Sequence, residues 1–213
     1  MKLYYGLPLE AYSNSFLTKF DIFYRQLIED EGGYVSKRVA KKIKDRGGAT
    51  KWGISLSFLK TVGVDIGDVN NDGVIDEKDI VILTKDQARW LYFKYFWNPL
   101  YTEIKNVQLG NRIFNVGVNI GKTKAVKILQ HSINKTLDIP LLKTDGIFGR
   151  QTLTAVVNIN QDKLYREFII DVEGFYRSLK KPQFINGWLK RLSRLIPKAI
   201  VQKIYNWTNK KAS

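Results

Sequence analysis

Residues 16–34 read FLTKFDIFYRQLIEDEGGY, and this stretch decides how the first part of the chain folds. Its apolar residues recur at helical spacing and form one stripe: Phe16, Leu17, Phe20, Phe23, Tyr24, Leu27 and Ile28. Ser13 or Ser15 can cap the start of the helix, and the Gly32-Gly33 pair ends it. We therefore predict a long amphipathic helix that has Glu31 at its C-terminus.

A helix C-terminus carries partial negative charge, so we expect it to raise the pKa of the Glu31 carboxyl. A general acid needs a raised pKa to hold its proton near neutral pH. Residues 45–54, DRGGATKWGI, then supply a second carboxylate, that of Asp45, and a hydroxyl, that of Thr50. This grouping suits acid-assisted cleavage of a sugar polymer. The alternative is a solvated Glu31 and an Asp45 that only anchors the glycine turn.

The composition excludes several classes of site. Cysteine is absent and His131 is the single histidine, which excludes disulfides, a cysteine nucleophile and a multi-histidine zinc site. The net charge of +15 favours a polyanionic partner such as nucleic acid, anionic lipid or an anionic cell wall. A basic surface without a specific partner is the alternative reading of this charge.

The chain shows neither a membrane span nor a signal peptide. No apolar run reaches the roughly 18 residues of a spanning helix, and Met1 to Tyr12 lacks a continuous apolar segment. We expect synthesis in the cytoplasm without a cleavable signal and no stable membrane insertion. Action in the periplasm or cell wall would then follow release through a holin-type pore or a secretion system.

The rest of the sequence predicts a mainly α protein with one small hairpin between residues 34 and 54. A capping box, Thr84 to Gln87, opens one of the helices, and Pro197 kinks or splits the last one. The predicted helices cover residues 54–62, 84–97, 109–120, 123–136, 150–159, 162–179 and 188–207.

The spacing of oxygen-bearing residues in residues 68–79, DVNNDGVIDEKD, matches a calcium loop. Glycine at position 6 allows the sharp turn, and position 12 is aspartate instead of the usual glutamate. We predict a structural Ca²⁺ site, the alternative being an Asp/Asn/Gly-rich turn that never holds metal. The expected ligands are Asp68, Asn70, Asp72, Val74, Asp76 and Asp79.

Several motifs in order resemble glycoside hydrolase family 108, a group of lysozyme-like N-acetylmuramidases found among phage endolysins and secretion-associated enzymes. The resemblance begins with Glu31-Gly-Gly-Tyr34 and residues 45–54 and continues through the calcium-like loop. The second half resembles the helical peptidoglycan-binding segment that accompanies this catalytic region. The further matching motifs are residues 88–99, 114–121, 145–152 and 187–191.

The resemblance implies a fold and an organisation of the chain. We expect a lysozyme-like helical catalytic region with a small hairpin or loop lobe, packed against a helical C-terminal peptidoglycan-binding region. The predicted boundaries are 13–105 for the muramidase region with its calcium loop, 106–200 for the binding region and 201–213 for a basic tail.

The resemblance also implies roles for three residues. Glu31 matches the catalytic glutamate that protonates the glycosidic oxygen. Asp45 and Thr50 match the positions that stabilise the oxocarbenium-like state and hold the attacking water. The loop between Glu31 and Asp45 departs from the commoner pattern, because it is longer and more basic.

Three further side chains are candidates for substrate binding. Tyr34 and Trp52 can stack on sugar rings, since aromatic faces match the apolar faces of pyranoses, or they can belong to the core. Asn119 can hydrogen-bond an N-acetyl group or merely cap a helix.

These observations predict a monomeric muramidase that cleaves the β-1,4 bond between N-acetylmuramic acid and N-acetylglucosamine in peptidoglycan glycan strands. A non-enzymatic, calcium-stabilised cell-wall-binding module is the alternative. Nucleic-acid binding is disfavoured, because the aromatic residues follow helical core periodicity and no RNA- or DNA-binding motif is present.

Overall fold

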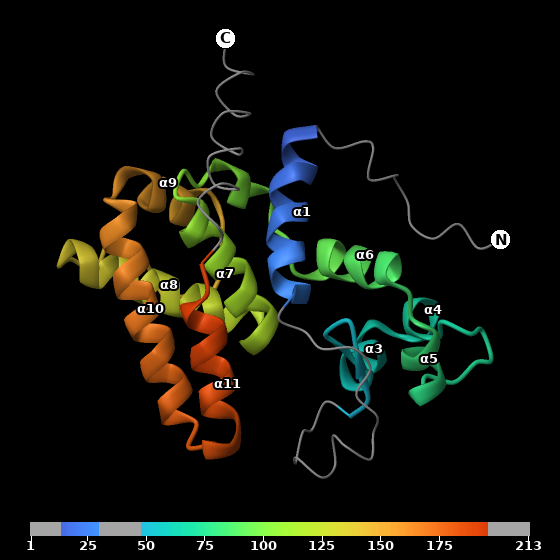
Figure 1. The fold of residues 1–213 in the computed structure, drawn as a ribbon. Helices are drawn as coiled ribbons and strands as arrows, with labels where there is room; N and C mark the ends of the chain where they lie inside the picture. Colours follow the sequence, from blue (N-terminus) through green and yellow to red (C-terminus); the bar gives the residue numbers. More distant parts are fainter. Residues whose placement is uncertain (1–13, 30–47, 196–213) are drawn as a thin grey trace. The chain divides into compact units, whose positions relative to one another are not determined.

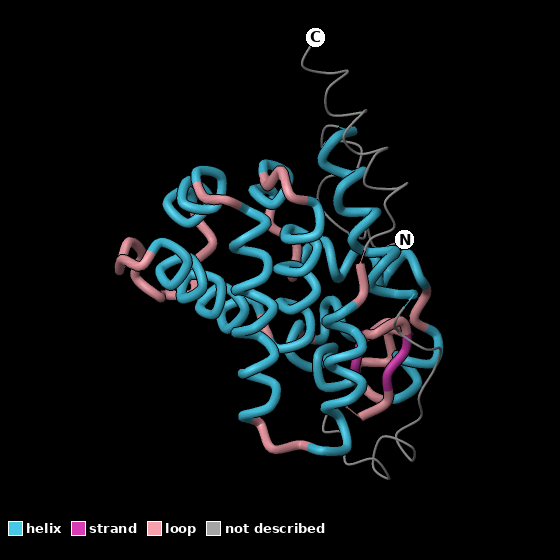
Figure 2. Tube along the Cα trace, turned by 60° about the vertical axis from the view of Figure 1, so that its left-hand side comes forward, coloured by secondary structure: helices cyan, strands magenta, loops and turns pink. Residues whose placement is uncertain are grey.

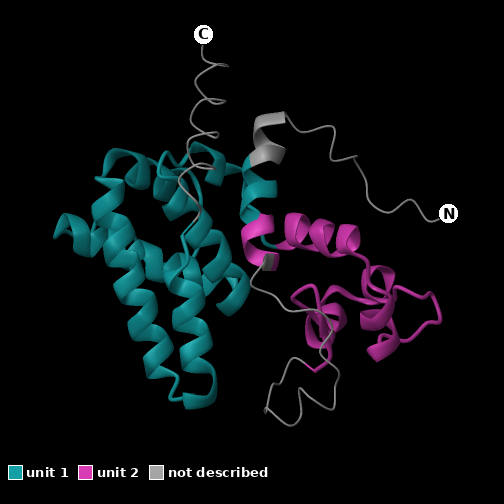
Figure 3. Ribbon diagram, viewed as in Figure 1, with its two compact units in different colours: residues 1–23, 96–213 teal, residues 24–95 magenta. Residues whose placement is uncertain are grey.

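The computed structural model describes residues 14–29 and 48–195, which are mainly helical, as predicted (Figures 1 and 2). The chain divides into two compact units (Figure 3): residues 24–95, and residues 1–23 together with 96–213. Helix α1, Asn14–Glu29, contributes to both units. Within the described ranges, no helix is long and apolar enough to cross a membrane. The predicted boundary between the muramidase region and the binding region, at residues 105 and 106, stays a prediction.

In the described part of the unit of residues 24–95, a hairpin and four helices accompany its part of α1. The two strands pair antiparallel, with Thr50 opposite Ser55 and Lys51 opposite Ile54. The Ser55 side chain caps the following helix by accepting a hydrogen bond from the Phe58 amide (3.1 Å). Its elements are β1 (Thr50–Lys51), β2 (Ile54–Ser55), α3 (Leu56–Val62), α4 (Val64–Gly67), α5 (Glu77–Ile82) and α6 (Lys85–Tyr95).

The other unit is built around α7, Val107–Ile120. Residues Leu109 to Gly117 of α7 are all buried, and helices α8 and α10 pack against it. The remaining elements are η2 (Pro99–Glu103), α8 (Lys122–Leu137), α9 (Arg150–Asn158), α10 (Gln161–Ser178) and α11 (Pro182–Ser193).

The last predicted helix, 188–207, is wrong in its bounds. Helix α11 begins at Pro182, because proline is preorganised for the first helical turn. It ends at Ser193, with Arg194 extended (φ −69°, ψ 136°). The remainder of the predicted helix from residue 196 onward lies outside the described residues.

An aromatic cluster forms the core beside α7. The Phe114 ring lies 6.1 Å from the Phe20 ring, 6.3 Å from the Phe23 ring and 5.8 Å from the Trp97 ring, centroid to centroid. Phe20 and Phe23 are on the same face of α1, as the helical spacing predicts. Gly110 makes room for this cluster, since a Cβ there would lie 3.2 Å from Cζ of Phe23.

Lys19 is a buried cation in the same unit. Its ammonium donates to the carbonyl oxygens of Thr102 (2.5 Å) and Ile104 (3.1 Å), and the residue is 6% exposed. Burial lowers the pKa of Lys19 from 10.5 to about 8. Between these two pKa values the unfolded chain keeps a proton that the folded chain has lost, so this group makes the protein more stable as pH rises.

We therefore expect the free energy of unfolding to rise by about 2 kcal/mol from pH 8 to pH 10 through Lys19 alone. Lys19→Met lacks this rise, and the difference between the two proteins in urea unfolding measures it. The measurement stays below pH 10 because burial raises the pKa of Tyr24 to about 12, which acts in the opposite direction at higher pH. Parallel pH curves for the two proteins would show that the Lys19 ammonium is solvated.

Candidate functional site

The structure describes half of the predicted catalytic and substrate-binding residues. Glu31, Tyr34 and Asp45 lie outside the described residues, in the segment of residues 30–47. Thr50 and Trp52 lie together in the β1–β2 hairpin, in the unit of residues 24–95. Asn119 is on α7, in the other unit. The roles assigned to all six residues stay predictions.

The turn between β1 and β2 places a tryptophan in an uncommon backbone conformation. Lys51 pairs with Ile54, so Trp52 and Gly53 form a two-residue turn, and both have positive φ (52° and 73°). This is the pattern of a type I′ turn, whose first position is usually asparagine, aspartate or glycine. A left-handed conformation costs a bulky residue roughly 1–2 kcal/mol. Trp52 therefore sits where a smaller residue would suit the backbone better.

Three interactions fix the Trp52 residue in place. Its indole Nε1 donates to the carbonyl of Leu83 (3.2 Å), and the Tyr92 hydroxyl donates to the Trp52 carbonyl (3.2 Å). The Lys85 ammonium lies over the indole ring, 4.6 Å from its centroid. Trp52 is half-buried, so part of its surface stays accessible to solvent. A ring held in this way is a rigid surface for stacking, and it also ties the hairpin to α6.

Thr50 is held at the start of the hairpin. Its hydroxyl donates to the carbonyl of Gly48 (3.3 Å), and the side chain is half-buried. Gly48 has φ +76°, the left-handed region that favours glycine, and Ala49 beside it is fully buried. The Leu56 amide donates to the Ala49 carbonyl (2.8 Å), which closes this segment onto α3. The Thr50 oxygen keeps lone pairs with which it can accept a hydrogen bond from water.

The two most buried carboxylates of the 68–79 loop bind its own backbone amides. Asp68 accepts hydrogen bonds from the amides of Asp72 (3.1 Å) and Gly73 (2.8 Å). Asp79, which is fully buried, accepts from the amides of Val69 (2.7 Å), Asn70 (3.2 Å) and Asp76 (2.8 Å). Asp76 and Asp79 thereby form the capping box of α5.

The oxygen donors of this loop suit Ca²⁺ chemically, but its described carboxylates do not gather into a metal-binding cluster. Gly73 has the positive φ (88°) that the sharp turn requires. Asp72 and Asp76 lie 3.7 and 3.9 Å from the Lys78 ammonium, and hydrogen bonds from Asn70 and the Val74 amide lower the pKa of Asp72. Across residues 14–29 and 48–195, no three acidic or histidine side chains converge as metal ligands. In this conformation, the loop is held by hydrogen bonds of its own.

A row of polar side chains on α7 was not predicted. Asn111, Asn115 and Asn119 follow one another at intervals of four, which puts them on one face of the helix. The Asn115 amide donates to the backbone and side-chain oxygens of Asn111 (2.9 and 2.8 Å). The Asn119 amide donates to the Tyr176 hydroxyl (2.7 Å). The spacing of these asparagines in an otherwise apolar helix is the signal that could have revealed the row.

Arg112, next to this row, connects α7 to the end of α11. Its guanidinium donates to the carbonyls of Arg191 (2.7 Å) and Arg194, although the residue is only 3% exposed. Burial raises the pKa of Tyr176 nearby, and the hydrogen bond from Asn119 and the charges of Arg191 and Arg112 oppose this. The crevice between these side chains holds only about 10 Å³, which is too small for a sugar ring. The crevice itself therefore does not hold a sugar ring.

Comparisons with known proteins agree with the resemblance found in the sequence. Residues 24–121 match the family model described as Glycosyl hydrolase 108, and residues 124–193 match the one described as Predicted Peptidoglycan domain. No curated protein matches the chain. Among solved structures, the chain is similar to Brucella abortus SagA, with 24% identity, coverage of 88% of this chain and 94% of that one, and a TM-score of 0.65.

At this level of identity, the similarity to SagA shows the fold alone. The two family matches follow each other along the chain and are separated by two residues. The first includes the predicted catalytic residues and the hairpin, and the second begins within α8 and ends with α11. Residues 24–121 thus form a glycosyl hydrolase 108 region and residues 124–193 a predicted peptidoglycan domain, which makes the chain a glycoside hydrolase directed at peptidoglycan.

Proposed function

We propose that this chain is an N-acetylmuramidase, which hydrolyses the β-1,4 bond between N-acetylmuramic acid and N-acetylglucosamine. The main support is the glycosyl hydrolase 108 match, which spans the Glu31-Gly-Gly-Tyr34 motif and the hairpin that carries Thr50. Glycoside hydrolysis requires a proton donor on one side of the scissile bond and a carboxylate or an activated water on the other. Glu31, Asp45 and Thr50 offer these groups.

In this proposal, Glu31 protonates the glycosidic oxygen as the bond to the leaving sugar breaks. Asp45 stabilises the positive charge that develops on the other sugar, and Thr50 orients the water that attacks it. The fixed backbone at Gly48 and Ala49 supports this role of Thr50, because a water is oriented only by a group that does not move.

Trp52 and Asn119 support substrate binding in different ways. Trp52 is rigid, since three interactions anchor it, and a rigid ring loses little entropy when it stacks on a sugar. Asn119 uses its amide nitrogen on Tyr176, so its Oδ1 is the atom proposed to accept the N–H of an N-acetyl group. Tyr34 is proposed as a second stacking residue.

The positive charge of the chain supports association with the wall. At +15, the protein is attracted to the carboxylates of the peptidoglycan peptides. The proposed enzyme is a monomer that binds no nucleic acid. It would act on the wall after passage through a holin-type pore or a secretion system.

Turbidity of a purified peptidoglycan suspension tests the proposal. We expect the protein to clear the suspension, and the initial rate to fall as salt screens the attraction between protein and wall. A suspension that stays turbid at every salt concentration would contradict hydrolysis and favour a non-enzymatic wall-binding module.

We also propose that the 68–79 loop binds Ca²⁺ as a structural ion. The support is the spacing of its donors, namely the carboxylates or amides of Asp68, Asn70, Asp72, Asp76 and Asp79 and the carbonyl of Val74. Bound calcium would brace the segment between α4 and α5, and no step of the hydrolysis passes through it. The carboxylates keep lone pairs beyond their present hydrogen bonds, and binding would require them to move toward a common centre.

Calorimetric titration checks this proposal. We expect heat of binding at millimolar calcium or below, and a melting temperature that rises with calcium concentration. Asp72→Asn should weaken binding by roughly tenfold, because it removes one ligand charge and keeps a side chain that can accept the Val74 amide. Asp65→Asn, outside the loop, is the matched control. Absence of binding heat at several millimolar calcium would contradict the proposal.

A further inference from the structure

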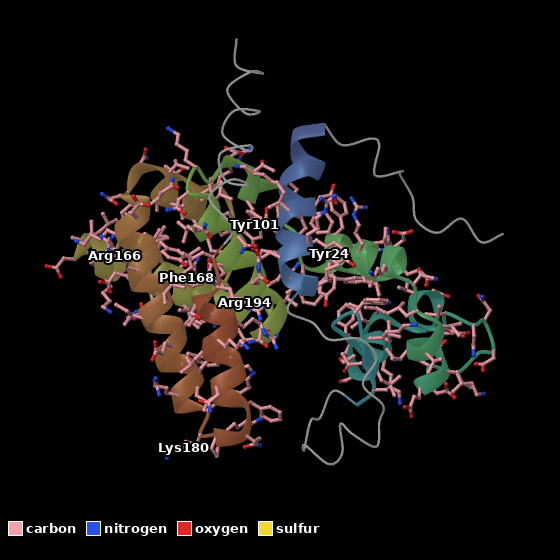
Figure 4. All side chains as sticks on the ribbon, viewed as in Figure 1. Tyr24, Tyr101, Arg166, Phe168, Lys180 and Arg194 are labelled. Carbon is pink, nitrogen blue, oxygen red and sulfur yellow. The ribbon has the colours of Figure 1, made fainter. Side chains whose placement is uncertain are left out.

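A basic pocket lies where α10 ends and α11 begins, at the turn labelled by Lys180 in Figure 4. The two helices pack side by side, and the pocket between their ends has a volume of about 310 Å³. The residues that line it are Tyr176, Arg177, Lys180, Lys181, Pro182 and Ile185. The pocket belongs to the predicted peptidoglycan domain and is separate from the proposed catalytic residues in the sequence.

The lining carries three cations and no acidic side chain. Arg177 is bonded to Glu173 on its own helix (2.6 and 2.9 Å), which offsets one of these charges. Among the described residues, neither Lys180 nor Lys181 takes part in an ion pair, and both side chains are exposed. The pocket therefore keeps two ammonium groups that are available to an anion.

The N-terminus of α11 adds positive potential to the pocket, whereas the C-terminus of α10 opposes it. No side chain caps the N-terminus of α11, and Pro182 occupies its first turn. At the end of α10, the carbonyls of Tyr176 and Arg177 accept hydrogen bonds from the amides of Leu179 and Lys180. The negative end of one helix is thus capped by the backbone, whereas the positive end of the other has no side-chain acceptor.

Lys180 has a left-handed backbone conformation. Its φ is +50°, in the left-handed region that costs free energy for residues other than glycine, and asparagine or glycine is the usual residue after a helix. A lysine at this position adds a charge to the pocket at the expense of backbone strain. Strained residues that persist in a fold point to a function for the side chain they carry.

We infer that this pocket binds a carboxylate of the peptide stem of peptidoglycan, with Lys180 and Lys181 as its charged contacts. The aliphatic part of the peptide next to the carboxylate would lie on the apolar wall formed by Pro182, Ile185 and the Tyr176 ring. This inference rests on the proposed function for its substrate, and it assigns recognition of the peptide to one place in the second region. The glycan strand itself would be bound elsewhere.

Binding of a double variant to two forms of peptidoglycan tests the inference. All proteins carry Glu31→Gln to prevent digestion, and binding is measured by sedimentation with peptidoglycan freed of secondary polymers. We expect Lys180→Asn combined with Lys181→Gln to bind intact peptidoglycan roughly tenfold more weakly, the combined effect of two exposed charge contacts. On peptidoglycan stripped of its peptides by an amidase, the same variant should bind as well as its parent.

Matched controls separate this effect from net charge and from folding. Lys143→Gln combined with Lys163→Gln removes the same charge from exposed positions outside the pocket and should leave binding unchanged. Asparagine tolerates the left-handed conformation, so Lys180→Asn should not lower the melting temperature. Unchanged binding to intact peptidoglycan, or an equal loss on both forms, would overturn the inference. Digestion by the Glu31→Gln parent would instead count against the proposed catalytic role of Glu31.

Discussion

Glu31→Gln is expected to slow the clearing of peptidoglycan by about 10²- to 10⁴-fold, the usual contribution of general acid catalysis. Glutamine keeps the size and shape of the side chain, but its amide is not acidic enough to transfer a proton to the glycosidic oxygen. Initial rates of clearing, measured for both proteins at equal concentration, give the ratio. The melting temperature should change little, because the substitution removes no packing volume.

Glu103→Gln is the matched control for this substitution. Glu103 is an exposed glutamate whose carboxylate pairs with Arg150 (2.8 Å), and a surface ion pair contributes little to stability. We expect this variant to clear peptidoglycan at the rate of the original protein. Equal clearing by the Glu31→Gln protein would mean that another group supplies the proton, and the assignment of Glu31 would then be wrong.

Phe114→Ala is expected to lower the free energy of unfolding by about 3–5 kcal/mol. Phe114 is 1% exposed and its ring contacts those of Phe20, Phe23 and Trp97, so truncation leaves a cavity in the aromatic cluster. The cluster packs α1 against α7 within one compact unit, and neighbouring rings cannot fill the cavity without leaving their own contacts. Urea unfolding of both proteins measures the difference.

Phe175→Ala is the comparison for the core substitution. Phe175 is half-buried on α10 and has the Lys124 ammonium 5.3 Å from its ring centroid, so its truncation should cost much less. A loss below about 1 kcal/mol for Phe114→Ala would show that the cluster repacks, and would contradict close packing of the four rings.

Most helices could be predicted from the sequence, because their apolar stripes and caps agree. The spacing of Phe20, Phe23 and Leu27 predicted the buried face of α1, and all three are buried. The prediction failed at α11, because the apolar pattern placed the helix start at Trp188, whereas the helix begins at Pro182. Proline signals a helix start as well as a helix break, and the hydrophobic pattern alone does not distinguish these two roles.

Contacts between distant segments could not be predicted. The sequence predicts a small hairpin between residues 34 and 54, but it does not place Trp52 in the turn. The anchors of Trp52 at Leu83, Lys85 and Tyr92 come from residues 31 to 40 positions away. The hydrogen bonds of Asp79 to the loop backbone are likewise a result of folding, and spacing alone favoured a metal ligand there.

The most direct test of the central claim is mass spectrometry of the products from purified peptidoglycan, after reduction of the new sugar ends. A muramidase leaves N-acetylmuramic acid at the reducing end, and we expect this product from the original protein and almost none from Glu31→Gln. Reducing ends of N-acetylglucosamine or anhydro-sugar products would contradict the account, because they mean that a different bond is cleaved or a different reaction is catalysed.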